Sequence, residues 1–199
     1  ISEPLATRLY DVTHSMIRDL HAVTRNRMLT AASLNCQPSD GIDYGLPLAP
    51  RTSDAKPYAL LFHGTSRVTK EWRESDWIGT GQALVRMGLD VILTWGNERE
   101  RLRCGRLAGG IKGARVLDRQ PLDAMAKLIA GAQLAIGVDT GLLHLAAAYR
   151  VPLIGIYLST EPGLTGPMGA GAINILGGRG QYPAYAQVVQ AAETMLHTA

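Results

Sequence analysis

Short apolar runs alternate with helix-like stretches from residue 58 onward, and this alternation constrains the fold more than any other feature of the chain. The apolar runs predict strands at 58–62, 90–94, 114–117, 134–138, 152–157 and 172–176. The stretches between and after them predict helices at 76–87, 98–108, 122–130, 141–149 and 184–196. Continuously apolar strands are buried on both faces. The order therefore predicts an α/β domain with a Rossmann-like, doubly wound parallel sheet.

The residues before position 58 follow a different pattern. Apolar residues at spacings of three and four predict an amphipathic helix over 5–23, with a second helical stretch after the polar residues 24–27. A stretch rich in Pro and Gly then reads as a linker. We therefore expect a helical segment at 1–36, a linker at 37–57 and the α/β domain at 58–199. Because the first residue is Ile1, we also expect the chain to lack an N-terminal part.

Composition excludes several classes of protein. Of the 199 residues 46% are apolar, but their runs are too short to cross a bilayer. Cys36 and Cys104 lie far apart without zinc-site spacing, which favours a cytoplasmic protein that binds no metal. Seven of the twenty basic residues fall between Arg99 and Arg119. This run is either a solvated helix face or a surface for phosphate-bearing partners or an anionic membrane. Nucleic-acid motifs are absent, so we expect no nucleic-acid partner.

The loops that follow the strands are the candidate site, because ligands of open parallel sheets bind beyond the carboxyl ends of the strands. After the first strand, Thr65, Ser66 and Lys70 offer hydroxyl and ammonium groups to phosphate oxygens. The alternative is an ordinary loop and helix cap. After the second strand, Glu98 and Glu100 are suited either to a ribose diol or to the dipole of the following helix.

The loop after the fourth strand has the most specific pattern. Asp139, Thr140 and Gly141 lead directly into a helix of Leu and Ala, so the free N–H groups of that helix form an anion site. Gly141 allows a ligand to approach closely, and Thr140 and His144 face the same way because they are four residues apart. Asp139 either caps the helix or binds a sugar hydroxyl, and His144 is either a ligand contact or a packed side chain.

Together these motifs resemble the lipopolysaccharide heptosyltransferases, a glycosyltransferase family with two facing Rossmann-like domains, the GT-B fold. The donor-site signature, the phosphate loop, the ribose loop and the Pro-Thr-Asp-Pro-Gly turn of the family resemble residues 138–148, 63–72, 95–100 and 159–166. Residues 21–27 and 43–46 resemble the interdomain segment of the heptosyltransferase I branch. The sequence departs from the family pattern at Leu158, Ser159 and Glu161, and Gln120 stands where some relatives carry Met near the adenine.

The resemblance implies transfer of L-glycero-D-manno-heptose from ADP-heptose to the Kdo of Kdo-lipid A, with inversion and without a cofactor. It places the enzyme in the cytoplasm, peripheral to the inner membrane. It puts the general-base Asp in the missing N-terminal domain, so this donor-binding part contains no catalytic residue and is inactive alone. The residue patterns and the resemblance assign donor binding to Thr65, Ser66, Lys70, Glu100, Gln120, Asp139, Thr140, Gly141 and His144.

Three other functions stay open from the sequence. One is that of heptosyltransferase II, and another is that of a different two-domain enzyme such as a nucleotide-sugar epimerase. The third is a non-catalytic nucleotide-binding module.

Overall fold

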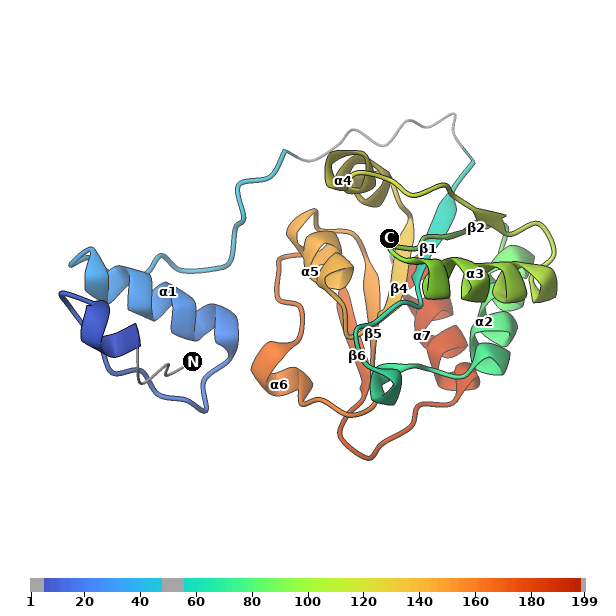
Figure 1. Ribbon diagram of the computed structural model, residues 1–199. Helices are drawn as coiled ribbons and strands as arrows, with labels where there is room; N and C mark the ends of the chain where they lie inside the picture. Colours follow the sequence, from blue (N-terminus) through green and yellow to red (C-terminus); the bar gives the residue numbers. More distant parts are fainter. Residues whose placement is uncertain (1–5, 48–55, 198–199) are drawn as a thin grey trace. The chain divides into compact units, whose positions relative to one another are not determined.

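The computed structural model of the chain describes residues 6–47 and 56–197 (Figure 1). These residues fall into two units. The first unit consists of the described residues of Ile1–Gly41 together with Gly163–Thr165. The second consists of the described residues of Ile42–Pro162 and Gly166–Ala199. The division at residues 36 and 57 that the sequence suggests stays a prediction.

The second unit is built on a six-stranded sheet in which every pair of neighbouring strands is parallel. The strand order is β3-β2-β1-β4-β5-β6, and the strands are β1 (Tyr58–Phe62), β2 (Asp90–Leu93), β3 (Arg115–Val116), β4 (Leu134–Val138), β5 (Leu153–Tyr157) and β6 (Ile173–Gly177). The order reverses between β1 and β4, which is the switch point where such sheets bind ligands. The predicted doubly wound parallel sheet is confirmed.

Helices cover both faces of this sheet (Figure 1). One core lies between the sheet and three helices, which are α2 (Glu74–Arg86), α3 (Glu98–Gly110) and α7 (Tyr185–His197). The other core lies beneath α4 (Leu122–Ala130) and α5 (Gly141–Ala148). Alternate residues of β1 enter opposite cores, Leu61 the first and Leu60 the second, because successive strand side chains point to opposite faces.

The helices and strands of this unit end within about two residues of the positions that the sequence predicts. The periodicity missed two short helices, the 3₁₀ turn η2 (Val68–Lys70) and α6 (Pro162–Thr165), because neither is long enough to show a repeat. Within the described residues, no helix combines the length and the apolarity that a membrane crossing requires.

The helix predicted over residues 5–23 is wrong. Of that range, the structure describes a 3₁₀ turn, η1 (Ala6–Leu9), and irregular chain until α1 begins at Ala22; Leu5 lies outside the described residues. The polar stretch that was expected to interrupt the helix lies inside α1 (Ala22–Ser33), which His21 caps by accepting the N–H of Val23. An amphipathic pattern forms a stable helix when its apolar face is buried. Of the residues in this pattern, Leu9 and Val12 are 85% and 69% exposed, and Met16 and Leu20 are only half-buried.

Candidate functional site

Asp139 is the point where loops from three strands meet. It directly follows β4, and its Oδ2 accepts hydrogen bonds from Lys70 Nζ at 2.6 Å and Thr160 Oγ1 at 2.8 Å. Thr65 Oγ1 donates to the backbone oxygen of Asp139 at 3.4 Å. Lys70 and Thr65 belong to the loop after β1, and Thr160 belongs to the loop after β5. Residues that are 69 and 21 positions from Asp139 in the chain thus meet at one edge of the sheet.

This arrangement decides against the cap reading of Asp139. The N-cap position of α5 is Thr140, and no side-chain cap hydrogen bond is formed there. The Asp139 carboxylate turns instead to Lys70, and their side chains are only 14% and 16% exposed. The sequence reasoning did not single out Thr160, although it stands in the turn that resembles the family motif. A hydroxyl residue just beyond the end of a buried strand was the available signal.

The N-terminus of α5 opens at the same edge. A Cβ placed on Gly141 would meet no atom within 4 Å, so the first turn of the helix faces open space. The first N–H groups of a helix have no partner inside it, and they carry its positive end. Thr140 is half-buried beside this turn, and His144 is half-buried one turn further along α5. The helix therefore presents donors next to the Lys70–Asp139 pair.

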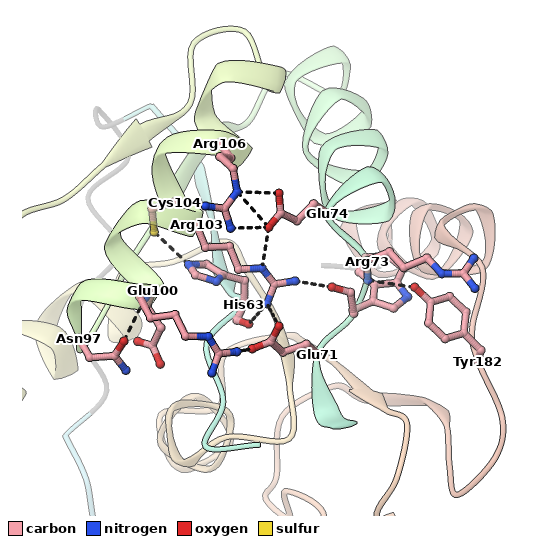
Figure 2. Close-up of polar contacts among 12 residues, drawn as sticks. His63, Glu71, Arg73, Glu74, Asn97, Glu100, Arg103, Cys104, Arg106 and Tyr182 are labelled. Carbon is pink, nitrogen blue, oxygen red and sulfur yellow. Dashed lines mark hydrogen bonds and ion pairs between the residues drawn. The ribbon is translucent and has the colours of Figure 1, made fainter. Parts of the chain in front are cut away.

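Glu100 joins the loops after β1 and β2. Its carboxylate accepts the N–H of Gly96 at 2.7 Å and lies so close to Gly64 that a Cβ there would be 2.6 Å from its Cδ. Asn97 caps α3 by accepting the N–H of Glu100 at 3.0 Å (Figure 2). Glu98, in contrast, is exposed and pairs with Arg101. Of the two acids that the sequence singled out, only Glu100 is thus built into the edge of the sheet.

The last two candidates, Ser66 and Gln120, belong to other parts of the loops at this edge of the sheet. Ser66 is exposed on the loop after β1. Gln120 lies in the loop after β3, and its Nε2 donates to the Asp118 carbonyl at 2.9 Å. Because β2 and β1 separate β3 from β4, Gln120 stands at the far side of the edge, where only an elongated ligand would also reach Asp139.

Nearby carboxylates neutralise much of the positive charge of the basic run between Arg99 and Arg119. Four of its seven basic residues form ion pairs with Glu71, Glu74 or Glu98; they are Arg99, Arg101, Arg103 and Arg106. Paired charges attract distant anions weakly. This pattern favours the solvated helix face over a surface for phosphates or lipids.

A buried polar cluster lies behind the loop after β1. His63 Nε2 is 2.9 Å from Cys104 Sγ, and both side chains are fully buried (Figure 2). Burial, with the nearby Arg103 charge, lowers the pKa of His63 to about 4, so its ring is neutral at pH 7. Burial raises the pKa of Cys104 to about 12, which keeps the thiol protonated and unreactive. Among the described residues, no group of three or more His, Cys, Asp or Glu side chains could hold a metal ion.

An open parallel α/β sheet with a free helix N-terminus at its switch point is the arrangement typical of nucleotide-binding domains. Residues 2–193 match the sequence model of glycosyltransferase family 9 (heptosyltransferase), and the chain belongs to this family.

Among its relatives is lipopolysaccharide heptosyltransferase 1 of Pseudomonas aeruginosa, which is 41% identical over 177 residues, 87% of this chain and 50% of that protein. The solved structure of E. coli heptosyltransferase WaaC with ADP has a TM-score of 0.82 and 34% identity, covering 97% of this chain and 62% of that one. The structure of WaaC with ADP-2-deoxy-2-fluoro heptose has a TM-score of 0.76 and 32% identity, covering 98% and 61%. The chain spans about half the length of the curated relative it matches.

Proposed function

We propose that this chain is the donor-binding part of a transferase that moves L-glycero-D-manno-heptose from ADP-heptose to the Kdo of Kdo-lipid A. The observation that carries the proposal is the meeting of Lys70, Asp139 and the open start of α5 at the switch point of the sheet. A relative named lipopolysaccharide heptosyltransferase 1, and a similar structure with bound ADP, support this reading. They favour it over heptosyltransferase II, an epimerase or a non-catalytic nucleotide-binding module.

The diphosphate is the part of the donor that the geometry suits best. The N–H groups at the start of α5, with Thr140 and Gly141, offer uncharged donors to phosphate oxygens. Lys70 adds a positive charge, and Thr65 and Ser66 add hydroxyl groups from the facing loop. Asp139 holds the Lys70 ammonium in place at 2.6 Å. When the bond to the heptose breaks, negative charge grows on the departing diphosphate, and these groups are already oriented to stabilise it.

The other candidates take the remaining parts of the donor. Glu100, fixed between Gly64 and Gly96, accepts hydrogen bonds from the ribose hydroxyls. Gln120, at the far side of the edge, lies beside the base. His144 and Asp139 face the heptose side of the diphosphate. This assignment runs the donor along the edge from the loop after β3 to the loop after β4.

The acceptor side of the proposal concerns the part of the protein beyond this chain. There we place the general base, the site for Kdo-lipid A and the contact with the cytoplasmic face of the inner membrane. Heptosyltransferase I and II then differ in the acceptor that they use. A transfer assay of the full-length protein with ADP-heptose and Kdo-lipid A tests this part of the proposal, and a protein that binds the donor but transfers no sugar would be a binding module.

Calorimetry with ADP and with adenosine tests donor binding by the chain itself. Wild-type protein should bind ADP, and Lys70→Ala should weaken ADP binding about 10- to 150-fold, the value of a charged hydrogen bond of about 1.5–3 kcal/mol. Adenosine binding should change less than about twofold, because the ammonium acts on phosphate charge. Lys112→Ala, which removes an exposed ammonium at the opposite end of β3, is the matched control.

Two results would contradict the proposal. One is that folded wild-type protein shows no affinity for ADP up to millimolar concentration. The other is that Lys70→Ala weakens ADP and adenosine equally, which would make Lys70 a structural residue.

A further inference from the structure

Arg103 contacts both ends of the loop that leaves β1. It lies on α3, and its side chain is buried at 6% exposure. Its Nη1 donates to the carbonyl of His63 at 3.1 Å, and its Nη2 donates to the carbonyl of Trp72 (Figure 2). His63 is the first residue after β1, and Trp72 comes just before α2 begins. One guanidinium thus spans the start and the end of the loop.

Two carboxylates hold the buried guanidinium. Glu71 Oε2 lies 3.5 Å from its Nη1, and Glu74 Oε1 lies 3.5 Å from its Nε. Glu71 belongs to the loop itself and Glu74 to the first turn of α2. A buried charge is tolerated when carboxylates and carbonyls surround it in this way. The planar fork of arginine also suits two separated carbonyls, whereas a lysine ammonium reaches one point.

The far end of the loop is fixed independently of Arg103. Trp72 is fully buried, and its Nε1 donates to the Pro183 carbonyl at 2.9 Å. The N–H of Arg73 donates to the Tyr182 hydroxyl at 3.0 Å (Figure 2). Arg103 therefore ties the start of the loop to an anchored end, and this limits the course that the chain between them can take.

The stretch between the two anchors carries Thr65, Ser66 and Lys70. Its turn η2 is held by local hydrogen bonds, from Lys70 N to Arg67 O at 3.0 Å and from Glu71 N to Val68 O at 2.9 Å. Local bonds shape a turn but do not position it against β4. On α3, Glu100 lies one turn before Arg103 and packs against Gly64 of the same loop. Helix α3 therefore supports this loop at its start and at its end.

We propose that Arg103 is a positioning residue for donor binding, which holds the loop from His63 to Trp72 so that Lys70 and Thr65 face the diphosphate. The inference rests on the proposed function, since it deepens the account of the same site. Arg103 itself does not touch the donor.

Arg103→Met tests the proposal, because it keeps most of the side-chain volume and removes every donor. Arg106→Met is the matched control: it lies one turn further along α3, and its hydrogen bonds within the described part of the chain go to Glu74. Amide hydrogen exchange and calorimetry with ADP and adenosine are the two measurements. In Arg103→Met we expect faster exchange at the Lys70 and Glu71 amides, ADP binding weaker by about tenfold, and adenosine binding within about twofold of wild type. Arg106→Met should match wild type in all three.

A double-mutant comparison separates positioning from general stability. If Arg103 acts through Lys70, then Lys70→Ala should weaken ADP less in the Arg103→Met background than in wild type, because that contact is already impaired. Arg103→Lys, which keeps the charge but reaches only one carbonyl, should restore part of the ADP affinity and of the amide protection.

The other possible outcomes also decide whether Arg103 positions the loop. If Arg103→Met resembles Arg106→Met in exchange and in ADP affinity, the proposal is wrong. Equal losses for ADP and adenosine, with faster exchange throughout β1 and β4, would make Arg103 a general stabiliser of the fold and would also overturn it. If wild-type protein fails to bind ADP, the proposed function fails, and exchange at Lys70 and Glu71 still shows whether Arg103 holds the loop. If Arg103→Met does not fold, Arg103→Lys is judged by the same measurements.

Discussion

Replacing Asp139 by Asn separates the two tasks that the structure gives this carboxylate. The change keeps the shape of the side chain and one oxygen for Thr160, but it removes the charge that faces Lys70 at 2.6 Å. In the free protein the ammonium then loses its ion-pair partner. In the complex with ADP, the same change removes a negative charge that repels the diphosphate. We therefore expect stability to fall while ADP affinity rises.

The size of the stability loss follows from the burial of the pair. Exposed ion pairs contribute about 0–1 kcal/mol, whereas breaking a fully buried pair costs about 3–5 kcal/mol. With side chains that are 16% and 14% exposed, Lys70 and Asp139 lie between these limits. We expect Asp139→Asn to lower the free energy of unfolding by about 1–3 kcal/mol. For a chain of this length, each kcal/mol lowers Tm by about 2–4 °C.

The gain in ADP affinity follows from Coulomb's law. For an assumed separation of about 8 Å and an effective dielectric of about 40, removing one repulsive charge is worth about 1 kcal/mol, or about fivefold in Kd. This gain should shrink as salt is added, because the site lies at the open edge of the sheet.

Thermal unfolding and ADP calorimetry on the same samples, at low and high salt, measure both effects. Thr160→Val is the control, because it removes the hydroxyl that donates to Asp139 at 2.8 Å and leaves the carboxylate charge in place. It should cost about 1.5–3 kcal/mol of stability, the value of a hydrogen bond to a charged group, and leave the Kd for ADP within about twofold. An Asp139→Asn variant that is as stable as wild type, or that binds ADP more weakly, would contradict both roles given to this carboxylate.

Two further perturbations test the surroundings of the site. The pKa of His63 is lowered from 6.5 to about 4, so between these values the unfolded chain binds a proton that the folded chain does not. The stabilisation that comes from neutral His63 is complete above pH 6.5 and is lost as pH falls toward 4. Urea unfolding should therefore show the free energy of unfolding decline by at most about 3 kcal/mol over this range, and His63→Gln should lack this decline. Identical pH profiles for the two proteins would exclude this account. Gly64→Ala should displace the Glu100 carboxylate, because the new Cβ would lie 2.6 Å from the Glu100 Cδ. The binding of adenosine and of ADP should then weaken equally, by about fivefold, which corresponds to a loss of about 1 kcal/mol. Gly96→Ala, where the nearest Glu100 atom is 3.4 Å away, should bind both ligands like wild type, and equal behaviour of the two variants would count against a role for Glu100.

Local pattern in the sequence was enough to predict the α/β unit. Strands such as 58–62 and 134–138 are continuous apolar runs, and a helix-forming stretch follows each one, so the parallel sheet was determined by neighbouring residues alone. The loops after β1, β2 and β4 were predictable for the same reason, since the carboxyl ends of parallel strands share one edge.

The same reasoning failed where a pattern depended on burial. Residues 5–23 have helical spacing, yet side chains such as Leu9 and Val12 are exposed, and residues 6–23, the described part of this range, are largely irregular. Periodicity shows that a face could be apolar, but it does not show what would cover that face.

The partners of the charged residues depend on contacts between distant parts of the chain, which the sequence does not reveal. The sequence left Asp139 as a cap or a ligand, and the fold pairs it with Lys70, 69 residues away. The basic run looked like one surface, but Arg103 turns inward to the carbonyls of His63 and Trp72 while its neighbours pair with Glu71 and Glu74. Ion pairs and carbonyl contacts act over a few ångströms in space, and distance along the chain carries no information about them until the sheet brings its loops together.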